Sequence, residues 1–212
     1  PVFALRTAAY MIGQKAQPIF EEIKLPLETM RTETDRITRL MDDLLQFARE
    51  PVLATQVCDL RGLCQAAATS YRAVHGDTPA VQVEAPESVG AVLDRDRVTQ
   101  VLINLIDNAR KHAKGCTRVV LQAGDDGSHV TLRVTNDGRG ISTDNLPHIF
   151  EPFYTGGGGT GLGLSIVERL IKAHGGTITV DSSIERGTCF TIRLPLAAPQ
   201  VRRESAPGAS GR

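Results

Sequence analysis

Hydrophobic residues recur at three- and four-residue spacing through the first fifty positions, a pattern that predicts two amphipathic helices. Leu5, Ala9 and Ile12 begin the apolar face of the first helix. Pro18 and Pro26 are expected to bracket the break between the helices, because proline lacks a backbone N–H. The second helix follows a heptad rhythm, with one face formed by Leu27, Met30, Thr34, Ile37, Met41, Leu44 and Ala48.

A hairpin of two helices cannot cover this apolar stripe by itself. Two copies pairing as a four-helix bundle would cover it, so the pattern predicts a homodimer through residues 1–50. The alternative is a hairpin that packs on its own C-terminal domain. That alternative is less favoured, because the C-terminal part has enough strands and helices to form its own core.

After Glu50-Pro51 the pattern changes from long helices to alternating strands and helices. Residues 51–58 are expected to form a linker, and Asp59 is expected to cap a helix that runs to about Val74. Short strands follow at 81–85 and 91–94, and Asp94 is expected to cap a second long helix. We therefore expect residues 51–58 to separate a helical domain from a domain of mixed helices and strands.

The rest of the chain predicts two hairpins and one more helix. Strands at 118–124 and 129–136 flank the turn signal "DDGS", and a helix is expected from Leu162 to about His174. A second hairpin closes the domain by residue 196. The predicted fold class is α+β: a helical hairpin that forms a dimeric four-helix bundle, followed over 59–196 by an α/β sandwich and over 197–212 by a disordered tail.

Composition excludes several classes of protein. The 212 residues are 41% hydrophobic and 23% charged with a formal net charge of zero, which is typical of a globular domain and gives no field for nucleic acid. No apolar run is long enough to span a bilayer, so a membrane link is expected only through a preceding N-terminal region. The four cysteines lack paired spacing, which favours reduced thiols and a cytoplasmic location.

Three short segments carry candidate chemistry, and each also has an ordinary structural explanation. "NLIDNARKHA" (104–113) places amides and a lysine on one helix side, suited to Mg²⁺ and phosphate, although taken alone a solvated polar face is the favoured explanation. "NDGRGI" (136–141) offers a carboxylate for an exocyclic amine, or a simple turn. "GGGGTGLGLSIV" (156–167) precedes a helix and could bind an anion or serve as a linker. It lacks the lysine of a Walker A loop and does not follow the first strand of a βαβ unit, as a dinucleotide-binding fingerprint would.

The order and spacing of these segments resemble the N, G1, F and G2 boxes of the sensor histidine kinase ATP-binding domain, a Bergerat-type ATPase. "IFEPFY" (149–154) resembles the F box, and "GGTITVDSSIERGTCFTIRLP" resembles the closing hairpin. The resemblance spans nearly all of 59–196. It implies ATP and Mg²⁺ as ligands, and a homodimer and a response regulator receiver domain as partners.

The resemblance also implies roles for single residues. Asn108 would bind Mg²⁺ with Asn104 beside it, Lys111 and His112 would lie near the phosphates, and Asp137 would accept a hydrogen bond from the adenine amine. The implied nucleotide-binding set is Asn104, Asn108, Lys111, His112, Asp137, Gly138, Gly140, Ile141, Thr160, Gly161, Leu162, Gly163 and Thr188.

The helical hairpin resembles the dimerisation and phosphoacceptor module of the same family, with one departure. The family pattern is His-Glu-Leu-Arg-Thr-Pro-Leu, whereas this chain has Phe3-Ala4-Leu5-Arg6-Thr7-Ala8-Ala9. Phe3 has no lone pair with which to accept a phosphoryl group, and Ala4 cannot act as a base. Thr7 stands where the family orients a water for dephosphorylation of the response regulator.

Two functional interpretations therefore remain open. The chain could be a histidine kinase core that transfers phosphoryl groups from Mg-ATP to a histidine and then to a response regulator. It could instead be an ATP-binding pseudokinase, or a phosphatase or docking module without autophosphorylation. Between the F and G2 boxes only about Thr155 to Gly158 remain, which indicates a short, glycine-rich lid.

Overall fold

The computed structural model describes residues 2–15, 20–87, 89–156 and 159–196, and it divides the chain into two units, Pro1–Glu50 and Pro51–Arg212. The first is called here the helical unit, and the second the sandwich unit. The expected tail at 197–212 and Pro18 lie outside the described residues. Among the described helices, none combines the length and the apolar character that crossing a bilayer requires.

The helical unit consists of α1 (Val2–Lys15) and α2 (Phe20–Ala48). Pro26 lies inside α2, so the prediction that it bounds the break is wrong. The fixed φ of proline is helical, but Pro26 is the seventh residue of this 29-residue helix, so its missing N–H costs one hydrogen bond inside α2. Arg6 of α1 lies 3.7 Å from the carboxylate of Asp35 on α2, an exposed ion pair across the hairpin.

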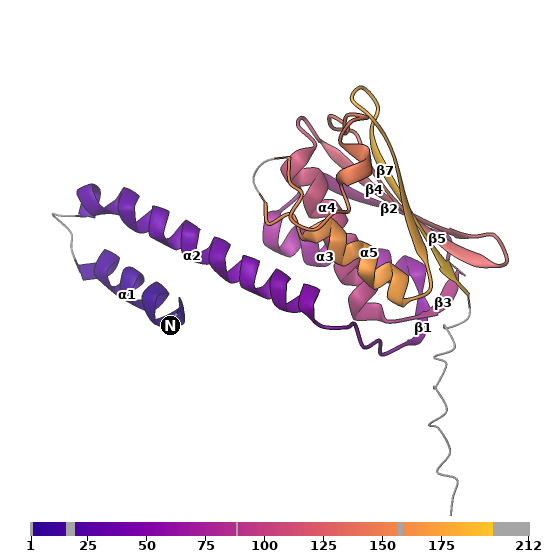
Figure 1. Ribbon diagram of the computed structural model, residues 1–212, viewed down its shortest axis with the longest axis horizontal. Helices are drawn as coiled ribbons and strands as arrows, with labels where there is room; N and C mark the ends of the chain where they lie inside the picture. The colour runs from indigo at the N-terminus through magenta and orange to yellow at the C-terminus, as the bar shows by residue number, and fades with distance from the viewer. Residues whose placement is uncertain (1, 16–19, 88, 157–158, 197–212) are drawn as a thin grey trace, which may run out of the picture. The chain divides into compact units, whose positions relative to one another are not determined.

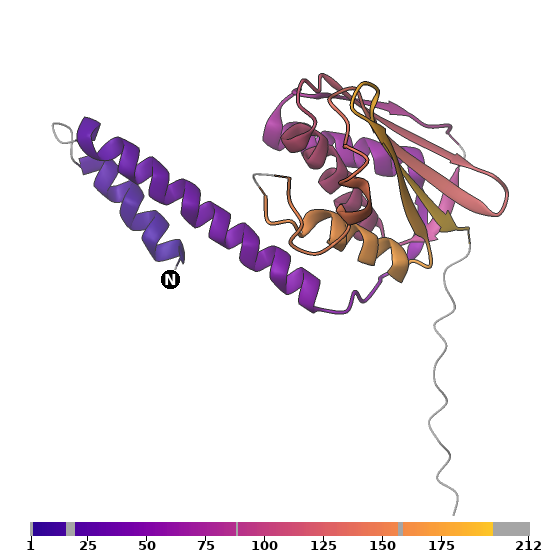
Figure 2. The ribbon, with the colours of Figure 1, turned by 45° about the horizontal axis from the view of Figure 1, so that its top comes forward.

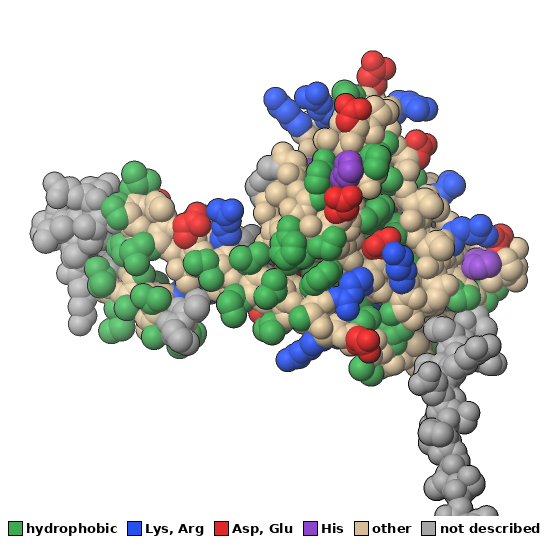
Figure 3. All heavy atoms as spheres, in the orientation of Figure 1, with side chains coloured by type: hydrophobic (Ala, Val, Ile, Leu, Met, Phe, Trp, Pro, Cys, Tyr) green, Lys and Arg blue, Asp and Glu red, His purple; other side chains and the backbone are tan. Residues whose placement is uncertain are grey.

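The apolar stripe of the helical unit is exposed to solvent within a single chain. Figure 3 shows hydrophobic side chains gathered along these helices. The large ones with more than two-fifths of their surface exposed are Phe3, Leu5, Tyr10, Met11, Ile12, Leu25, Met30, Ile37, Leu40, Met41, Leu44 and Leu45. Soluble monomers rarely leave so long an apolar surface uncovered.

The sandwich unit contains a five-stranded sheet in the order β2-β4-β5-β7-β6. β2 (Ala80–Glu84) runs parallel to β4 (Arg118–Asp125), and the remaining pairs, formed by β5 (His129–Asn136), β7 (Gly187–Pro195) and β6 (Thr177–Ser183), are antiparallel. A second, two-stranded sheet pairs β1 (Gln56–Asp59) with β3 (Gly90–Leu93). The expected linker at 51–58 is therefore too long, because β1 begins at Gln56.

Three helices cover one face of the large sheet: α3 (Leu60–His75), α4 (Arg95–His112) and α5 (Gly163–Ala173) (Figures 1 and 2). A short 3-10 helix, η1 (Leu146–His148), lies in the connection that follows β5. The apolar faces of the helices and the alternate residues of the strands form one core, which confirms the α+β class.

Two predicted caps fix where the helices begin. The carboxylate of Asp59 accepts hydrogen bonds from the N–H groups of Arg61 and Gly62, and Asp94 accepts one from Arg97 at 3.0 Å. The second oxygen of Asp94 accepts the N–H of Ala54 at 2.8 Å. One carboxylate thus caps α4 and holds the segment that precedes β1.

His174 joins the end of α5 to the start of α4. Its Nε2 accepts the backbone N–H of Asp94 at 3.1 Å, and its Nδ1 lies 2.7 Å from the carbonyl oxygen of Leu170. Nε2 is therefore unprotonated and Nδ1 carries the hydrogen, so this buried imidazole is neutral. It serves the fold, in keeping with its place in the core.

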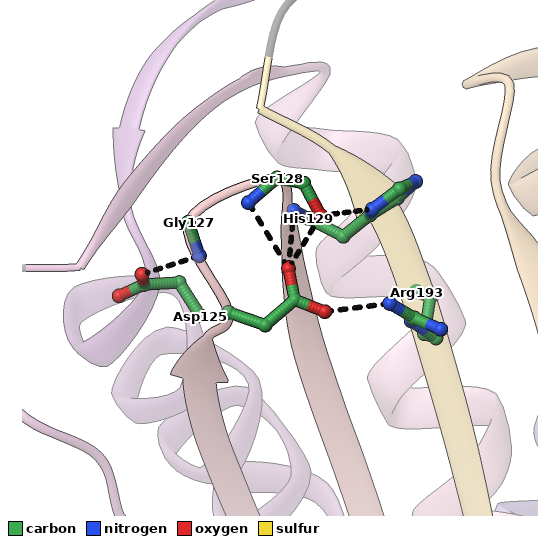
Figure 4. Close-up of polar contacts among 6 residues, drawn as sticks. Asp125, Gly127, Ser128, His129 and Arg193 are labelled. Atoms are coloured by element: carbon green, nitrogen blue, oxygen red, sulfur yellow. Dashed lines mark hydrogen bonds and ion pairs between the residues drawn. The ribbon is translucent and has the colours of Figure 1, made fainter.

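The turn between β4 and β5 is held by Asp126, whose partners Ser128, His129 and Arg193 are labelled in Figure 4. One of its oxygens accepts hydrogen bonds from the N–H groups of Ser128 and His129 and from the Ser128 hydroxyl. The other accepts from Arg193 of β7 at 2.6 Å. These donors, the Ser128 hydroxyl first, lower the pKa of the Asp126 carboxyl well below its ordinary value.

Candidate functional site

The glycine segment ends at a helix start whose N–H groups have no side-chain cap. α5 begins at Gly163, and Leu162 before it is buried and offers no capping side chain. The Thr160 hydroxyl accepts the N–H of Leu162 at 3.3 Å, outside the helix proper. The first N–H groups of α5 therefore remain available to an anion at the positive end of the helix dipole.

The segment between Phe153 and Gly161, called here the glycine loop, is closed at its base by these two residues. The Phe153 N–H donates to the Gly161 carbonyl at 3.0 Å, and both residues have positive φ, 66° and 70°. A Cβ on Gly161 would lie 2.5 Å from the Phe153 carbonyl carbon. Gly161 is thus required by the loop's own backbone, whereas a Cβ on Gly163 would meet no atom within 4 Å.

Asn104 and Asn108 lie one turn apart on α4 with their side chains partly exposed. Among the described residues, neither amide side chain makes a hydrogen bond. Amide oxygens without partners at the edge of a core are suited to bind a hard cation or water. The structure leaves both amides free for such a ligand.

Lys111 is less free than the sequence suggested. Its ammonium lies 2.5 Å from the carboxylate of Asp107, which also receives two hydrogen bonds from Arg110. Burial alone would raise the pKa of Asp107, but the hydrogen bonds from Lys111 and Arg110 outweigh it and hold this pKa below its ordinary value. Lys111 would have to leave a charged partner to contact a phosphate.

His112 brings the end of α4 close to the glycine segment. A Cβ on Gly159 would lie 3.8 Å from the His112 Nε2, although the two residues are far apart in the sequence. Partial desolvation, with the Lys111 charge, lowers the pKa of His112, so its imidazole is neutral at pH 7. The first and third candidate segments therefore meet at the end of α4.

Asp137, to which the resemblance to the kinase family assigns the adenine amine, is hydrogen-bonded within the protein. Its carboxylate is exposed and accepts the N–H groups of Thr117 and Arg118 at 2.9 Å and the Thr117 hydroxyl at 2.6 Å. Burial would raise the pKa of Asp137, but these hydrogen bonds outweigh it and lower the pKa to about 2. The carboxylate joins β4 to the end of β5.

Asn136, one residue earlier, is the buried polar residue of this segment. Asn136 is 6% exposed and lies directly opposite Thr188 of β7, which is 5% exposed. Sequence analysis placed Thr188 in the site but missed Asn136. The strand period could have identified it, since Asn136 continues the core-facing row of Val130, Leu132 and Val134.

Gly138, Gly140 and Ile141 shape the segment after β5 through contacts with the protein itself. A Cβ on Gly138 would lie 2.6 Å from the Ala113 carbonyl oxygen, and one on Gly140 would lie 2.1 Å from that of Ser183. The Ile141 N–H donates to the Ser182 hydroxyl at 2.8 Å. Both glycines are therefore needed for close backbone packing, which fixes the end of β5 against α4 and β6.

In the helical unit, Phe3 is 83% exposed on α1. Thr7, one turn later, donates its hydroxyl hydrogen to the Phe3 carbonyl at 2.9 Å. This bond is local to the helix. The position expected for a phosphoacceptor is occupied by the phenyl ring of Phe3.

Comparison with known proteins gives this arrangement a family. The family described as histidine kinase-, DNA gyrase B- and HSP90-like ATPase matches residues 93–198, half of the chain. The chain belongs to this ATPase family. Its matched segment contains α4, the end of β5, the glycine loop and Thr188, which are the parts of the candidate site in the sandwich unit.

Curated relatives of this ATPase-family chain are sensor histidine kinases. Sensor histidine kinase ZraS of Escherichia coli strain K12 is 33% identical over 202 residues, 92% of this chain and 43% of ZraS. The probable sensor histidine kinase TcrY of Mycobacterium tuberculosis is 37% identical over 198 residues, 88% of this chain and 41% of TcrY. The chain thus spans less than half the length of these relatives, and it corresponds to a histidine kinase ATP-binding core.

Solved structures agree with this family assignment. Full-length ShkA in complex with AMPPNP superposes with a TM-score of 0.70 at 28% identity, over 84% of this chain and 39% of ShkA. Histidine kinase ThkA in complex with the response regulator TrrA gives a TM-score of 0.70 at 25% identity, over 92% of this chain and 57% of ThkA.

Proposed function

We propose that this ATPase-family chain binds Mg-ATP and is the catalytic core of a two-component sensor histidine kinase. The proposal rests on two features of the described residues: two amide side chains on α4 lack hydrogen-bond partners, and the helix start at Gly163 lacks a side-chain cap. Amide oxygens suit Mg²⁺, and free N–H groups suit phosphates. The relative ShkA, crystallised with AMPPNP, supports a nucleotide as the ligand.

Each part of the site has a separate task in this proposal. Asn108, with Asn104 beside it, would hold Mg²⁺, which would neutralise phosphate charge. The N–H groups at Gly163 and the residues from Thr160 to Leu162 would orient the phosphates. Neutral His112 and the Lys111 ammonium, once released from Asp107, would lie at the phosphate end. Phosphoryl transfer then depends mainly on positioning.

A response regulator is the proposed protein partner. ThkA, whose structure matches 92% of this chain, was solved in complex with the response regulator TrrA. We propose that the helical unit contacts a receiver domain and that this core acts in the cytoplasm. In a regulator-directed reaction, Thr7 would orient the attacking water for dephosphorylation.

Phe3 and Ala4 favour a second candidate function for this chain. A phenyl ring has no atom that could accept a phosphoryl group, and a methyl group cannot remove a proton. The chain would then bind ATP as a pseudokinase, or dephosphorylate or dock a regulator, without phosphorylating itself at this position. The two candidates share the nucleotide site and differ only in the fate of the γ-phosphate.

Labelling with γ-labelled ATP separates the two candidates. The unaltered chain should incorporate no label, whereas a Phe3→His, Ala4→Glu variant should become labelled on the new imidazole, because a nucleophile and a base then stand on α1. A Phe3→Ala, Ala4→Glu variant is the matched control and should stay unlabelled. Label on the unaltered chain would support self-phosphorylation elsewhere and argue against the pseudokinase candidate.

The exposed stripe of α1 and α2 leads us to propose a homodimer. Light scattering at micromolar concentration should give twice the mass of the chain, since pairing would remove side chains such as Met30, Ile37 and Met41 from water. An Ile37→Glu, Met41→Glu variant should be monomeric, and Asp42→Ala is a control on the same helix. A monomer for the unaltered chain would contradict the proposal.

A further inference from the structure

Asp107 lies on α4 directly before Asn108, and three basic side chains surround its carboxylate. Its Oδ2 lies 2.5 Å from the Lys111 ammonium, and its Oδ1 accepts hydrogen bonds from two nitrogens of Arg110 at 2.9 and 2.7 Å. Nε2 of His75 on α3 lies 4.0 Å from the same Oδ1. Only 23% of the Asp107 side chain is exposed, so water screens these attractions less than it screens those of a surface ion pair.

Lys111 projects from α4 between Asp107 and Asn108. Successive residues of an α-helix are turned by about 100°, so Asp107 and Asn108 face different sides of the helix. Lys111 follows them by four and three residues, and its direction therefore falls between theirs. A lysine side chain has a flexible four-carbon stem, so its ammonium can be drawn to either side. In the structure the ammonium lies on the side of Asp107.

We propose that Asp107 is a positioning residue that competes with phosphate for the Lys111 ammonium. Before a nucleotide binds, the carboxylate holds the ammonium on the side of α4 away from Asn108. A bound triphosphate draws the ammonium to the other side, and Asp107 then keeps the two hydrogen bonds from Arg110. This inference rests on the proposed nucleotide binding and adds to it a residue that lowers, and so regulates, the affinity of the site for ATP.

Arg110 is the reason that the carboxylate cannot follow Lys111. Two nitrogen donors of its guanidinium meet the same oxygen of Asp107, three residues earlier on α4. This pair fixes the carboxylate on its own side of the helix, and His75 of α3 adds a further basic group there. Lys111 contacts the other oxygen through a single nitrogen, so it is the partner that a phosphate can remove.

Within the described residues, α5 holds an ion pair with the same spacing in a different setting. Lys172 lies 2.7 Å from Glu168, and 65% of the Lys172 side chain is exposed, against 32% for Lys111. An exposed pair of this kind contributes little beyond its own helix. Glu168→Gln is therefore the matched control, since it removes a carboxylate from the same arrangement at residues that have no part in the proposed site.

The test measures the affinity of the full chain for Mg-ATP by calorimetry. Asp107→Asn should bind Mg-ATP about twofold to fivefold more tightly than the unaltered chain, because the ammonium no longer has to leave a charged partner. Glu168→Gln should bind it as the unaltered chain does. A substitution that merely damaged the fold would weaken binding, so the direction of the change separates a positioning role from a structural one.

A second comparison shows whether the effect passes through Lys111. Lys111→Ala should bind Mg-ATP more weakly than the unaltered chain, since a charged phosphate contact is lost. Adding Asp107→Asn to Lys111→Ala should then leave the affinity unchanged, because the pair no longer exists. If Asp107→Asn tightens binding equally with lysine and with alanine at position 111, the carboxylate acts on the phosphates by its own charge and the inference is wrong.

The possible failures are distinguishable. If the unaltered chain binds Mg-ATP but Asp107→Asn binds it no more tightly, the ion pair only supports α4 and the inference is wrong. If the unaltered chain binds no Mg-ATP, the proposed function itself fails. A crystal structure of the unaltered chain with Mg-AMPPNP needs no variant: the Lys111 ammonium should lie on a phosphate oxygen, with Arg110 still on Asp107. Lys111 still paired with Asp107 in that complex would also overturn the inference.

Discussion

Replacing Gly140 by alanine should lower the free energy of unfolding of the sandwich unit by about 2–4 kcal/mol. The new Cβ would lie 2.1 Å from the Ser183 carbonyl oxygen and 2.7 Å from that of Gly187. Both atoms belong to backbone at the paired ends of β6 and β7, so no side chain can turn aside. The turn between β6 and β7 must therefore move away from the end of β5. Urea unfolding measures the resulting loss of unfolding free energy.

Gly124→Ala is the matched control for this prediction. Gly124 lies in β4 with ordinary φ, and a Cβ there would meet nothing within 4 Å. Its replacement should leave the unfolding midpoint nearly unchanged or raise it slightly, since alanine reduces the entropy of the unfolded chain. Equal midpoints for the two variants would show that the segment after β5 yields easily, against the close packing described above.

Local patterns were enough to predict most of the elements. The period of two places Val130, Leu132 and Val134 of β5 on one face, and the structure confirms that face as the core. Asp59 and Asp94 were identified as caps from their side chains and the helices that follow them, and both accept the expected N–H groups. These signals involve residues within a few positions of one another, so the sequence alone displays them.

The errors arose where distant backbone or a tolerant position determined the outcome. β1 was expected to be linker, because four residues form a strand only by pairing with β3 some thirty positions later. Pro26 was expected to bound the break between the two helices, but α2 continues through it despite the loss of one backbone hydrogen bond. Each outcome depends on interactions with the rest of the element or with a distant strand, which local propensity does not describe.

The candidate site shows the same division between local sequence signals and contacts made by distant residues. The glycine loop and the amides of α4 were identified as candidates from their residue types, yet their approach at His112 and Gly159 is a tertiary contact. Asp137 was named because a carboxylate can accept a hydrogen bond from an exocyclic amine, and Asn136 was not considered. Counting the strand period to its end would have placed Asn136 on the buried face and Asp137 outside it.

Asn108→Ala should weaken binding of ATP in the presence of Mg²⁺ by about 10–100-fold. The amide oxygen of Asn108 is the proposed metal ligand, and losing a contact to a charged group typically costs about 1.5–3 kcal/mol, which corresponds to this change in affinity. The side chain has no partner within the described protein, so its removal should hardly alter the unfolding midpoint. Calorimetric titration with ATP, in Mg²⁺ and in EDTA, measures the effect.

The EDTA titration makes the prediction specific to the metal. Without Mg²⁺ the unaltered chain and Asn108→Ala should bind ATP with similar, weaker affinity, because the missing amide then has no ion to hold. Asn145→Ala removes an exposed asparagine whose side chain caps nothing, and it should match the unaltered chain in both conditions. An equal loss of affinity with and without Mg²⁺ would mean that Asn108 contacts the nucleotide directly. The metal would then have to be held elsewhere, with Asn104 as the next candidate on the same side of α4.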